Sequence, residues 1–320
     1  EQLAFFRGKL GNLVPTQHWD DMVGEAHDTG FMVAGAAEAD LLTDLAAAVD
    51  RAIAEGRGIE EFRKDFRSVV ARNGWTGWTG EGSVGGEAWR VKTILRTNAY
   101  TSYAAGRFAQ LREAGYPFWV YRHGDSQQPR PQHLEWDGLV LSSDHAFWSK
   151  YYPPSDWGCS CYVVGARSER AAKRLGGDLA KRLPTNWSAI DPKTGEPRGI
   201  GKGWGYAPGA SVAQATNAAA SKIWSWDYRI GKAFLADLPE AQRDALSAAY
   251  RALPSTADDA RRYARRVFEG ADDPQPGRTL GMMRSDQLAT VAAGLDGDAR
   301  AFDFSLAPDD LRHIIREHTD

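Results

Sequence analysis

The stretch that decides the fold runs from Pro117 to Ala166 and reads PFWVYRHGDSQQPRPQHLEWDGLVLSSDHAFWSKYYPPSDWGCSCYVVGA. Three short segments in it are β-branched or aromatic and bounded by turn residues, which predicts strands. These segments are residues 118–121, 139–142 and 162–164. A long helical stretch, roughly 86–114, comes before them and ends at Gly115. We therefore predict a small central α+β unit of short strands packed on a long helix.

Apolar residues at helical spacing on both sides of this unit predict further helices. The fold class is therefore α+β, in a mostly α-helical chain with a helical C-terminal module. We predict five regions along it. These are a helical N-terminal region (1–85), the α+β core (86–180), an irregular connection rich in Gly, Pro and Trp (181–211), a helical C-terminal region (212–272) and a terminal segment (273–320).

Composition and charge limit the classes of protein to which this chain can belong. The chain has 320 residues and a formal net charge of −3, so it carries no global basic field of the kind that concentrates nucleic acid. Its two cysteines stand one residue apart, which argues against a disulfide scaffold and favours a reducing compartment. No run approaches the ~20 apolar residues of a membrane span, so no membrane partner is expected. A P-loop and a dinucleotide fingerprint are both missing from the sequence.

Candidate metal ligands cluster in the same central stretch. His123, His133, Cys159 and Cys161 are the nitrogen and sulfur ligands that Zn²⁺ prefers in structural sites. A small, loop-rich unit with little core gains stability from such a staple. Two alternatives stay open: the thiols are simply buried while His133 forms hydrogen bonds, or a cysteine and His133 form a nucleophilic pair. No thiol-protease signature supports the second alternative.

Tryptophans gather in Gly-rich loops around Trp75, Trp78 and Trp204. Because tryptophan is enriched at interfaces, these loops are candidate contact surfaces for other proteins. Indoles in a loop can equally fix that loop to its own core. Both interpretations follow from the sequence.

The order of many central residues resembles a known family. Arg96-Thr97-Asn98 and Tyr103–Arg107 are similar to the helix that opens the domain of phage Mu F-like head morphogenesis proteins. Further positions follow in that family's order, and the resemblance extends over residues 89–209. They include a structural core motif of Asn98, Arg107, Asp125, Arg130, Asp137, Gly138, Pro153 and Pro154, together with Tyr121, His133, Phe147, Trp148, Tyr152, Cys159, Cys161 and the segment Gly203–Gly209.

The resemblance implies a minor capsid protein of a tailed bacteriophage, acting in head morphogenesis near the portal and the DNA packaging machinery, and not an enzyme. The implied partners are the portal protein, the major capsid or scaffold proteins and packaged DNA. The implied location is the virion, after assembly in the host cytoplasm.

One departure from the family concerns the metal. Wider-family members have a Cys-x-x-Cys pair before Cys-x-Cys, and Arg130 and His133 stand where that first pair is expected. The resemblance therefore implies one structural zinc ion with three ligands, unless His123 or Asp125 adds a fourth. Alternatively, Arg130 pairs with Asp125 or Asp137 and holds the loops by a charge-assisted hydrogen bond.

The segment Leu306–His318 is similar to the opening of small nuclease-like domains found fused to Mu F-like proteins. The alternative function is therefore a phage-delivered nuclease or toxin carried by a C-terminal domain. A surface helix whose Arg and His residues favour the helix dipole explains the same residues.

Overall fold

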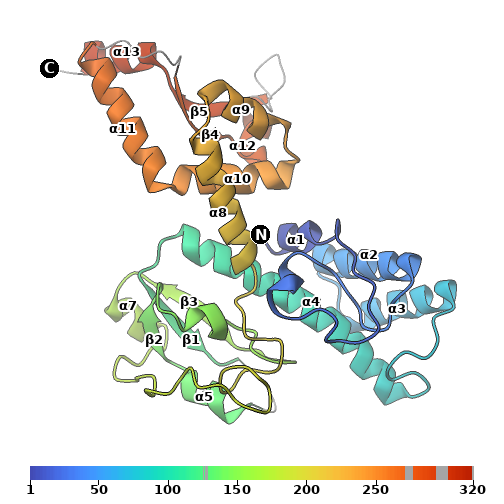
Figure 1. Ribbon diagram of the computed structural model, residues 1–320. Coiled ribbons are helices and arrows are strands. Elements are labelled where there is room, and N and C mark those ends of the chain that lie inside the picture. The colour runs from blue at the N-terminus through green and yellow to red at the C-terminus, as the bar shows by residue number, and fades with distance from the viewer. Residues whose placement is uncertain (125, 127–128, 271–276, 293–301, 319–320) are drawn as a thin grey trace. The chain divides into compact units, whose positions relative to one another are not determined.

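A computed structural model describes residues 1–320 except 125, 127–128, 271–276, 293–301 and 319–320 (Figure 1). The chain divides into two compact units, Glu1–Val212 and Ala213–Asp320. The first unit contains the elements α1 (Gln2–Gly8), η1 (Gly24–Asp28), α2 (Ala39–Glu55), α3 (Ile59–Asn73), α4 (Val84–Glu113), β1 (Phe118–Arg122), α5 (Pro131–Trp136), β2 (Val140–Ser142), α6 (Trp148–Tyr151), β3 (Tyr162–Ala166) and α7 (Glu169–Arg174).

The helices of the first unit end where the sequence supplies stop signals. Helices α2 and α3 are followed by Gly56 and Gly74, both in the left-handed conformation that glycine adopts without strain. Helix α4 begins after Ser83, whose side chain accepts a hydrogen bond from the backbone N–H of Gly86. The predicted long helix is therefore confirmed, with its start two residues earlier than expected.

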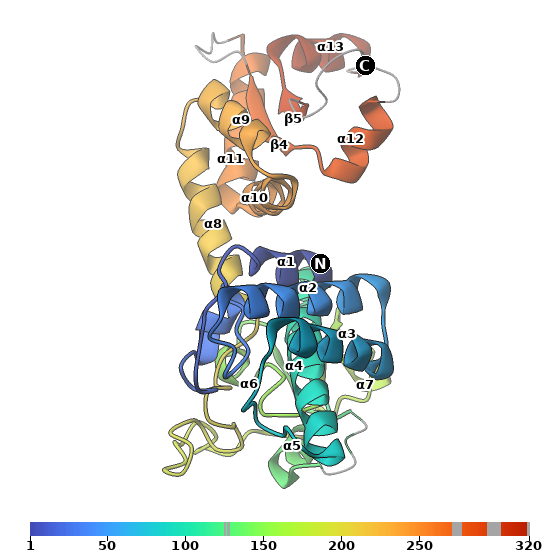
Figure 2. The ribbon, with the colours of Figure 1, turned by 90° about the vertical axis from the view of Figure 1, so that its right-hand side faces the viewer.

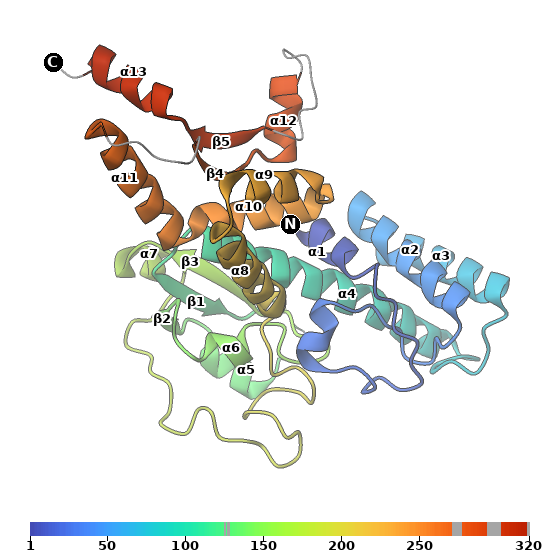
Figure 3. The same ribbon diagram turned by 45° about the horizontal axis from the view of Figure 1, so that its top comes forward.

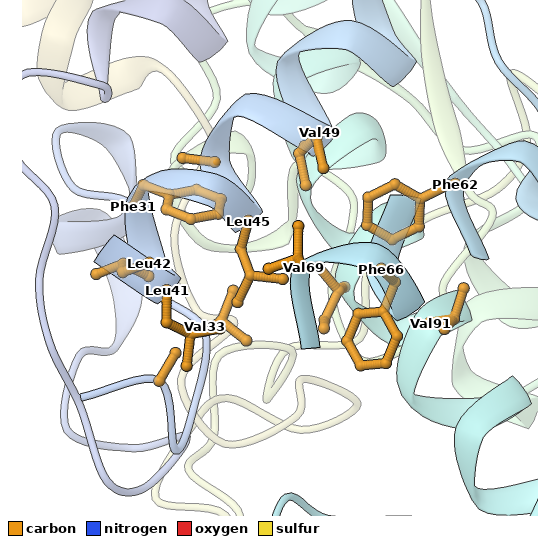
Figure 4. Packing of buried hydrophobic residues seen from close by; sticks show 14 of the residues in the cluster. Phe31, Val33, Leu41, Leu42, Leu45, Val49, Phe62, Phe66, Val69 and Val91 are labelled. Carbon is orange, nitrogen blue, oxygen red and sulfur yellow. The ribbon is translucent and has the colours of Figure 1, made fainter. Parts of the chain in front are cut away.

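The first hydrophobic core lies between α2, α3 and α4 (Figure 4). Leu45 and Val49 of α2 face Phe62, Phe66 and other buried side chains of α3, and Val91 of α4 closes the same cluster. All of these side chains are buried. Burying each such side chain stabilises the folded chain by about 1.5–3 kcal/mol. This core therefore fixes the position of α4, on which the sheet packs.

The sheet has three antiparallel strands in the order β2-β1-β3. The predicted strands are confirmed, and β3 runs two residues further than expected, to Ala166. Side chains alternate across β1: Val120 packs with Ala166 and Ala172 on one face. On the other face Trp119 contacts Phe108 of α4 edge-on, with ring centroids 5.7 Å apart. The sheet therefore packs on the long helix, as expected.

Residues 175–209 follow α7 without a named helix or strand, and Figure 3 shows them as a long irregular trace. This segment returns to the N-terminal part of the unit. The carboxylate of Asp28 accepts hydrogen bonds from the N–H of Gly209 at 2.8 Å and from the hydroxyl of Ser211 at 2.7 Å. Gly209 has φ 82°, and a Cβ there would lie 2.9 Å from the Cβ of Ala105, so only glycine allows this close approach to α4.

The second unit is mainly helical, as expected, with a two-stranded antiparallel sheet of β4 and β5 (Figure 2). The sequence did not predict this sheet. Tyr250 and Met282 belong to one buried cluster, and Tyr263 and Leu311 to another. Its elements are α8 (Ala210–Trp224, which begins in the first unit), α9 (Tyr228–Asp237), α10 (Glu240–Ala252), α11 (Pro254–Phe268), β4 (Arg278–Met282), α12 (Ser285–Ala292), β5 (Asp303–Leu306) and α13 (Pro308–His318).

The predicted boundary between residues 272 and 273 lies outside the described residues, within the second unit. Among the helices that the structure describes, none has both the length and the apolar character needed to cross a membrane.

Candidate metal centre

Three of the four predicted metal ligands meet inside the first unit. Nδ1 of His133 lies 3.7 Å from Sγ of Cys159 and 3.6 Å from Sγ of Cys161. The three candidate ligand atoms lie within 4.8 Å of one another, and the side chains are between 1% and 3% exposed. We call His133, Cys159 and Cys161 the thiol–imidazole centre.

Local structure explains why these side chains converge. Pro131 occupies the first turn of the short helix α5, where a missing N–H costs nothing, and His133 follows within that turn. The His133 ring stacks on Trp136 with centroids 5.2 Å apart. Cys159 and Cys161 precede β3 and are separated by one residue, so in an extended chain both side chains point to the same side.

The hydrogen bond made by Nε2 of His133 determines whether Nδ1 carries a proton. Nε2 lies 3.0 Å from the carbonyl oxygen of Gly199, which can only accept a hydrogen bond. Nε2 therefore carries the proton, and the Nδ1 lone pair faces the two thiols. A backbone carbonyl on the outer nitrogen is the arrangement that orients histidine ligands in metal sites.

The geometry of the centre fits a tetrahedral zinc ion. Bond lengths of about 2.3 Å to sulfur and about 2.0 Å to nitrogen imply a sulfur–nitrogen separation of about 3.5 Å at tetrahedral angles. The two separations here are 3.7 and 3.6 Å. When bound, such an ion would supply folding free energy to the loops that hold its ligands. His133, Cys159 and Cys161 would hold it.

The two thiols titrate as a pair. Interaction with the Cys161 thiol, and then with His133, lowers the pKa of Cys159 against the opposing effect of burial. The neighbouring Cys159 and burial together raise the pKa of Cys161. Backbone N–H groups of Ser155 and Gly124 also favour the thiolate forms. The pair therefore keeps one proton, which a bound cation would displace.

The same burial argues against the nucleophilic alternative. A catalytic thiolate has to be reached by its substrate, and reactive cysteines lie in partly exposed surroundings. Cys159 and Cys161 are 3% and 1% exposed. This burial is typical of structural cysteines and not of reactive ones.

The structure does not bring His123 into the centre, so its prediction as a ligand is corrected. The backbone N–H of His123 donates to the carboxylate of Asp137 at 2.8 Å, and His123 follows directly after the last residue of β1. Asp125, the other suggested fourth ligand, lies outside the described residues. The buried hydroxyl of Tyr121 has no hydrogen-bond partner in the part of the chain that the structure describes. Burial, and then the nearby thiols, raise the pKa of Tyr121 well above its ordinary value.

Two ion pairs hold the loops around the centre. Nε of Arg130 lies 2.7 Å from Asp156, and its Nη2 donates to the carbonyl of Trp157 at 3.0 Å. The expected partner Asp137 instead pairs with Arg122 at 3.0 Å, so the predicted Arg130–Asp137 pair is wrong. The physical reason is that the two residues lie at opposite ends of α5. Asp137 follows the helix beside the end of β1, whereas Arg130 precedes the helix beside the cysteine loop.

The remaining core-motif residues have structural roles in the same unit. Gly138 has φ 79°, and a Cβ there would lie 3.0 Å from the carbonyl oxygen of Gly176. The Pro153–Pro154 peptide bond is cis. On α4, the Asn98 side chain donates to the carbonyl of Ile94 at 3.0 Å, and Arg107 reaches Gln110 at 3.4 Å.

The tryptophans proposed as contact surfaces are not exposed. Trp75 and Trp78 are each 9% exposed and belong to the first core, where both rings contact Phe66 edge-on. Trp204 is 7% exposed. The prediction of a contact surface from these residues is corrected, because their indoles fix the loops to their own core. The exposed indoles among the described residues are instead Trp19, Trp89 and Trp157, which the sequence did not single out as contact surfaces.

Comparison with known proteins agrees with this description. Residues 43–164, which include the thiol–imidazole centre and most of the sheet, match the family described as "Phage Mu protein F like protein". Over this region the chain is similar to Mu F-like proteins, and the resemblance identified from the sequence is confirmed.

Two curated relatives are similar to it. The chain is 34% identical over 186 residues to the putative capsid assembly protein F of Escherichia phage Mu, covering 55% of this chain and 42% of that protein. It is 32% identical over 222 residues to the Mu-like prophage FluMu F protein of Haemophilus influenzae, covering 62% of this chain and 53% of that protein. The chain thus spans about half the length of these relatives. No solved structure matches it.

Proposed function

We propose that this chain is a capsid assembly protein acting in the head morphogenesis of a tailed phage. The observation that carries the proposal is the match of residues 43–164 to Mu F-like proteins, one of which is described as a putative capsid assembly protein. The matched residues lie within one compact unit and include the thiol–imidazole centre.

Within this role, the chain is a minor component of the virion, close to the portal and the packaging machinery. Its partners are the portal protein and the major capsid or scaffold proteins, and it lies near packaged DNA. A rigid unit suits such a position, because an interface on a preorganised surface loses little conformational entropy on binding. The α4 core, the sheet and the charged loops at Arg130 and Arg122 supply that rigidity.

The thiol–imidazole centre is a structural zinc site in this proposal. It joins three segments: α5, the cysteine loop and, through the hydrogen bond from His133 to Gly199, the irregular connection. A single ion there would stabilise loops that have few apolar contacts of their own.

The functional test is quantitative mass spectrometry of purified virions and head intermediates, from a phage carrying this gene and from one with a stop codon in it. We expect a low, fixed ratio of this chain to the major capsid protein, and defective heads without it. Normal infectious heads without the chain would overturn the proposal. Presence in head intermediates but not in virions would keep the assembly role and overturn the virion location.

A further inference from the structure

A small cavity lies in the first unit apart from the thiols. Its walls come from the N-terminal segment around Lys9, from the middle of α4 around Asn98 and from the loops at Trp157 and 202–206. Its volume is about 50 Å³. One water needs about 10–15 Å³ by the same measure, so the cavity has room for a group of a few heavy atoms.

A buried cation reaches this cavity. Lys9 is 3% exposed, and among the described residues no carboxylate lies within ion-pair distance of its Nζ and no hydrogen bond to Nζ is formed. The nearest compensation is the face of Phe5, whose ring centre lies 4.7 Å away. Burial lowers the pKa of Lys9 to about 8, so the ammonium is still the main form at neutral pH.

The neighbouring titratable groups do not neutralise this ammonium. Asp28 raises the pKa of Lys9, but its carboxylate is already bound by Gly209 and Ser211. Burial, and then Lys9, lower the pKa of His27 to about 4, so its ring is uncharged. A buried cation without a partner is costly, and the open space in front of Lys9 is where a partner would fit.

The other walls of the cavity select what that partner is. Trp157 contacts Trp19 and Trp204 edge-on, with ring centroids 5.9 and 5.2 Å apart. Trp19 and Trp157 remain 39% and 41% exposed, which is unusual for indoles in such a cluster. Asn98 also faces the cavity and has one amide N–H beyond the one it gives to Ile94. The walls thus offer one positive charge, one polar donor and flat apolar rings.

We propose that this cavity binds an alkyl carboxylate, supplied by an aspartate or glutamate side chain of a partner protein segment. The carboxylate pairs with Lys9 and Asn98, and the segment's backbone lies across Trp19 and Trp157. Lys202, the other cation on the wall, is exposed and already paired with Asp20 at 2.9 Å, so Lys9 is the residue that selects the charge. This inference does not depend on the proposed role in head assembly.

The test is thermal unfolding of the purified chain with N-acetyl-glutamate amide or its neutral isostere N-acetyl-glutamine amide, at equal ionic strength. We expect the glutamate compound, at about ten times its Kd, to raise Tm by about 3 °C, with no shift from the glutamine compound. The Lys9→Met variant, which keeps the side-chain length, should lose this shift. The matched control Lys64→Met, at an exposed lysine of α3 outside the cavity, should keep it within twofold in apparent Kd.

Equal shifts from both compounds, or an unchanged shift in Lys9→Met, would overturn the site. Propionate, a free small carboxylate without a peptide backbone, distinguishes a protein segment from a small-molecule ligand. Weaker stabilisation by propionate than by the glutamate compound supports a protein segment, whereas equal or stronger stabilisation by propionate overturns the segment and leaves a free small carboxylate as the ligand. Because the assay uses only purified chain, its failure says nothing about head assembly.

Discussion

Two buried polar regions of the first unit differ in how their groups are satisfied. In the thiol–imidazole centre, His133 and the two thiols contact one another, and backbone N–H groups and the Gly199 carbonyl complete their surroundings. In the cavity, Lys9 contacts the face of Phe5 and is influenced by Asp28, but among the described residues it forms no ion pair and no side-chain hydrogen bond. The first region is organised within the chain, and the second lacks a partner. Removing a polar group should therefore have opposite effects in the two regions.

The largest effect is expected at the centre. Cys161→Ala should abolish zinc binding, expected at about one ion per chain, and lower the free energy of unfolding by at least about 4 kcal/mol, because a ligand and its metal are lost together. Elemental analysis and chemical denaturation measure the two quantities. The control is Ser160→Ala, between the two cysteines, which removes a buried hydroxyl that has no hydrogen-bond partner among the described residues and should keep the metal. Equal stability of Cys161→Ala and Ser160→Ala would contradict a structural metal.

The cavity should respond in the opposite direction. At pH 7, Lys9→Met should raise the free energy of unfolding by about 3 kcal/mol, because the pKa of Lys9 in the folded chain is about 8 against an ordinary 10.5. Between these two values the unfolded chain binds more protons than the folded one, so the wild type gains stability as pH rises. The advantage of the variant is therefore complete below about pH 8 and is lost by about pH 10.5.

Denaturation of both proteins across this range measures the difference directly. Effects of pH on other groups cancel when the variant is subtracted from the wild type. A difference that does not change between pH 7 and pH 10.5 would mean that Lys9 already has a counterion.

A smaller effect is expected from the ion pair beside the cysteine loop. Arg130→Ala should lower the free energy of unfolding by about 1–2 kcal/mol and weaken zinc binding, because the half-buried Arg130–Asp156 pair positions that loop. The control is Arg67→Ala, which breaks a more exposed pair with Glu87 and should leave the free energy of unfolding almost unchanged. Equal metal affinity in both variants would remove Arg130 from the organisation of the centre.

The smallest effect on stability is expected at the mouth of the cavity. Trp19→Ala should cost about 1 kcal/mol, because the ring is partly exposed and makes one edge-on contact with Trp157. It should nevertheless weaken binding of N-acetyl-glutamate amide at least threefold, while Trp19→Phe keeps most of it. A stability loss as large as that of a core tryptophan would show that Trp19 acts in folding alone.

The sequence predicted the helices and strands whose signals lie in neighbouring residues. Helices α2 and α3 show apolar periodicity and end at glycines, α4 begins at a capping serine, and the three strands of the sheet are aromatic or β-branched. Strands β4 and β5 were missed because one contains Gly281 at a register shift and the other has only four residues. Strand β5 alternates polar and apolar residues, but only over the shortest run that marks a strand, and β4 is interrupted by a glycine.

The sequence likewise predicted one of the two candidate sites and missed the other. Residue type alone predicted His133, Cys159 and Cys161, because thiols and imidazole in one short stretch suggest one chemistry. Nothing in the sequence placed Lys9 beside Trp157 and Asn98, since these residues are distant along the chain and each is ordinary where it stands. The burial of Trp75 and Trp78 could not be foreseen either, because a Gly-rich loop with indoles looks the same whether it faces solvent or core.

The carboxylate of Asp28 has a mechanical consequence. It ties the chain at Gly209 and Ser211, just before the first unit ends at Val212, to a segment near the N-terminus. A force applied to the chain beyond Val212 is therefore borne first by the hydrogen bonds of Asp28 and by the close packing of Gly209 against Ala105, and not by the sheet. Under load the two ends of the unit would separate first, while the loops held by Cys159 and Cys161 stay closed.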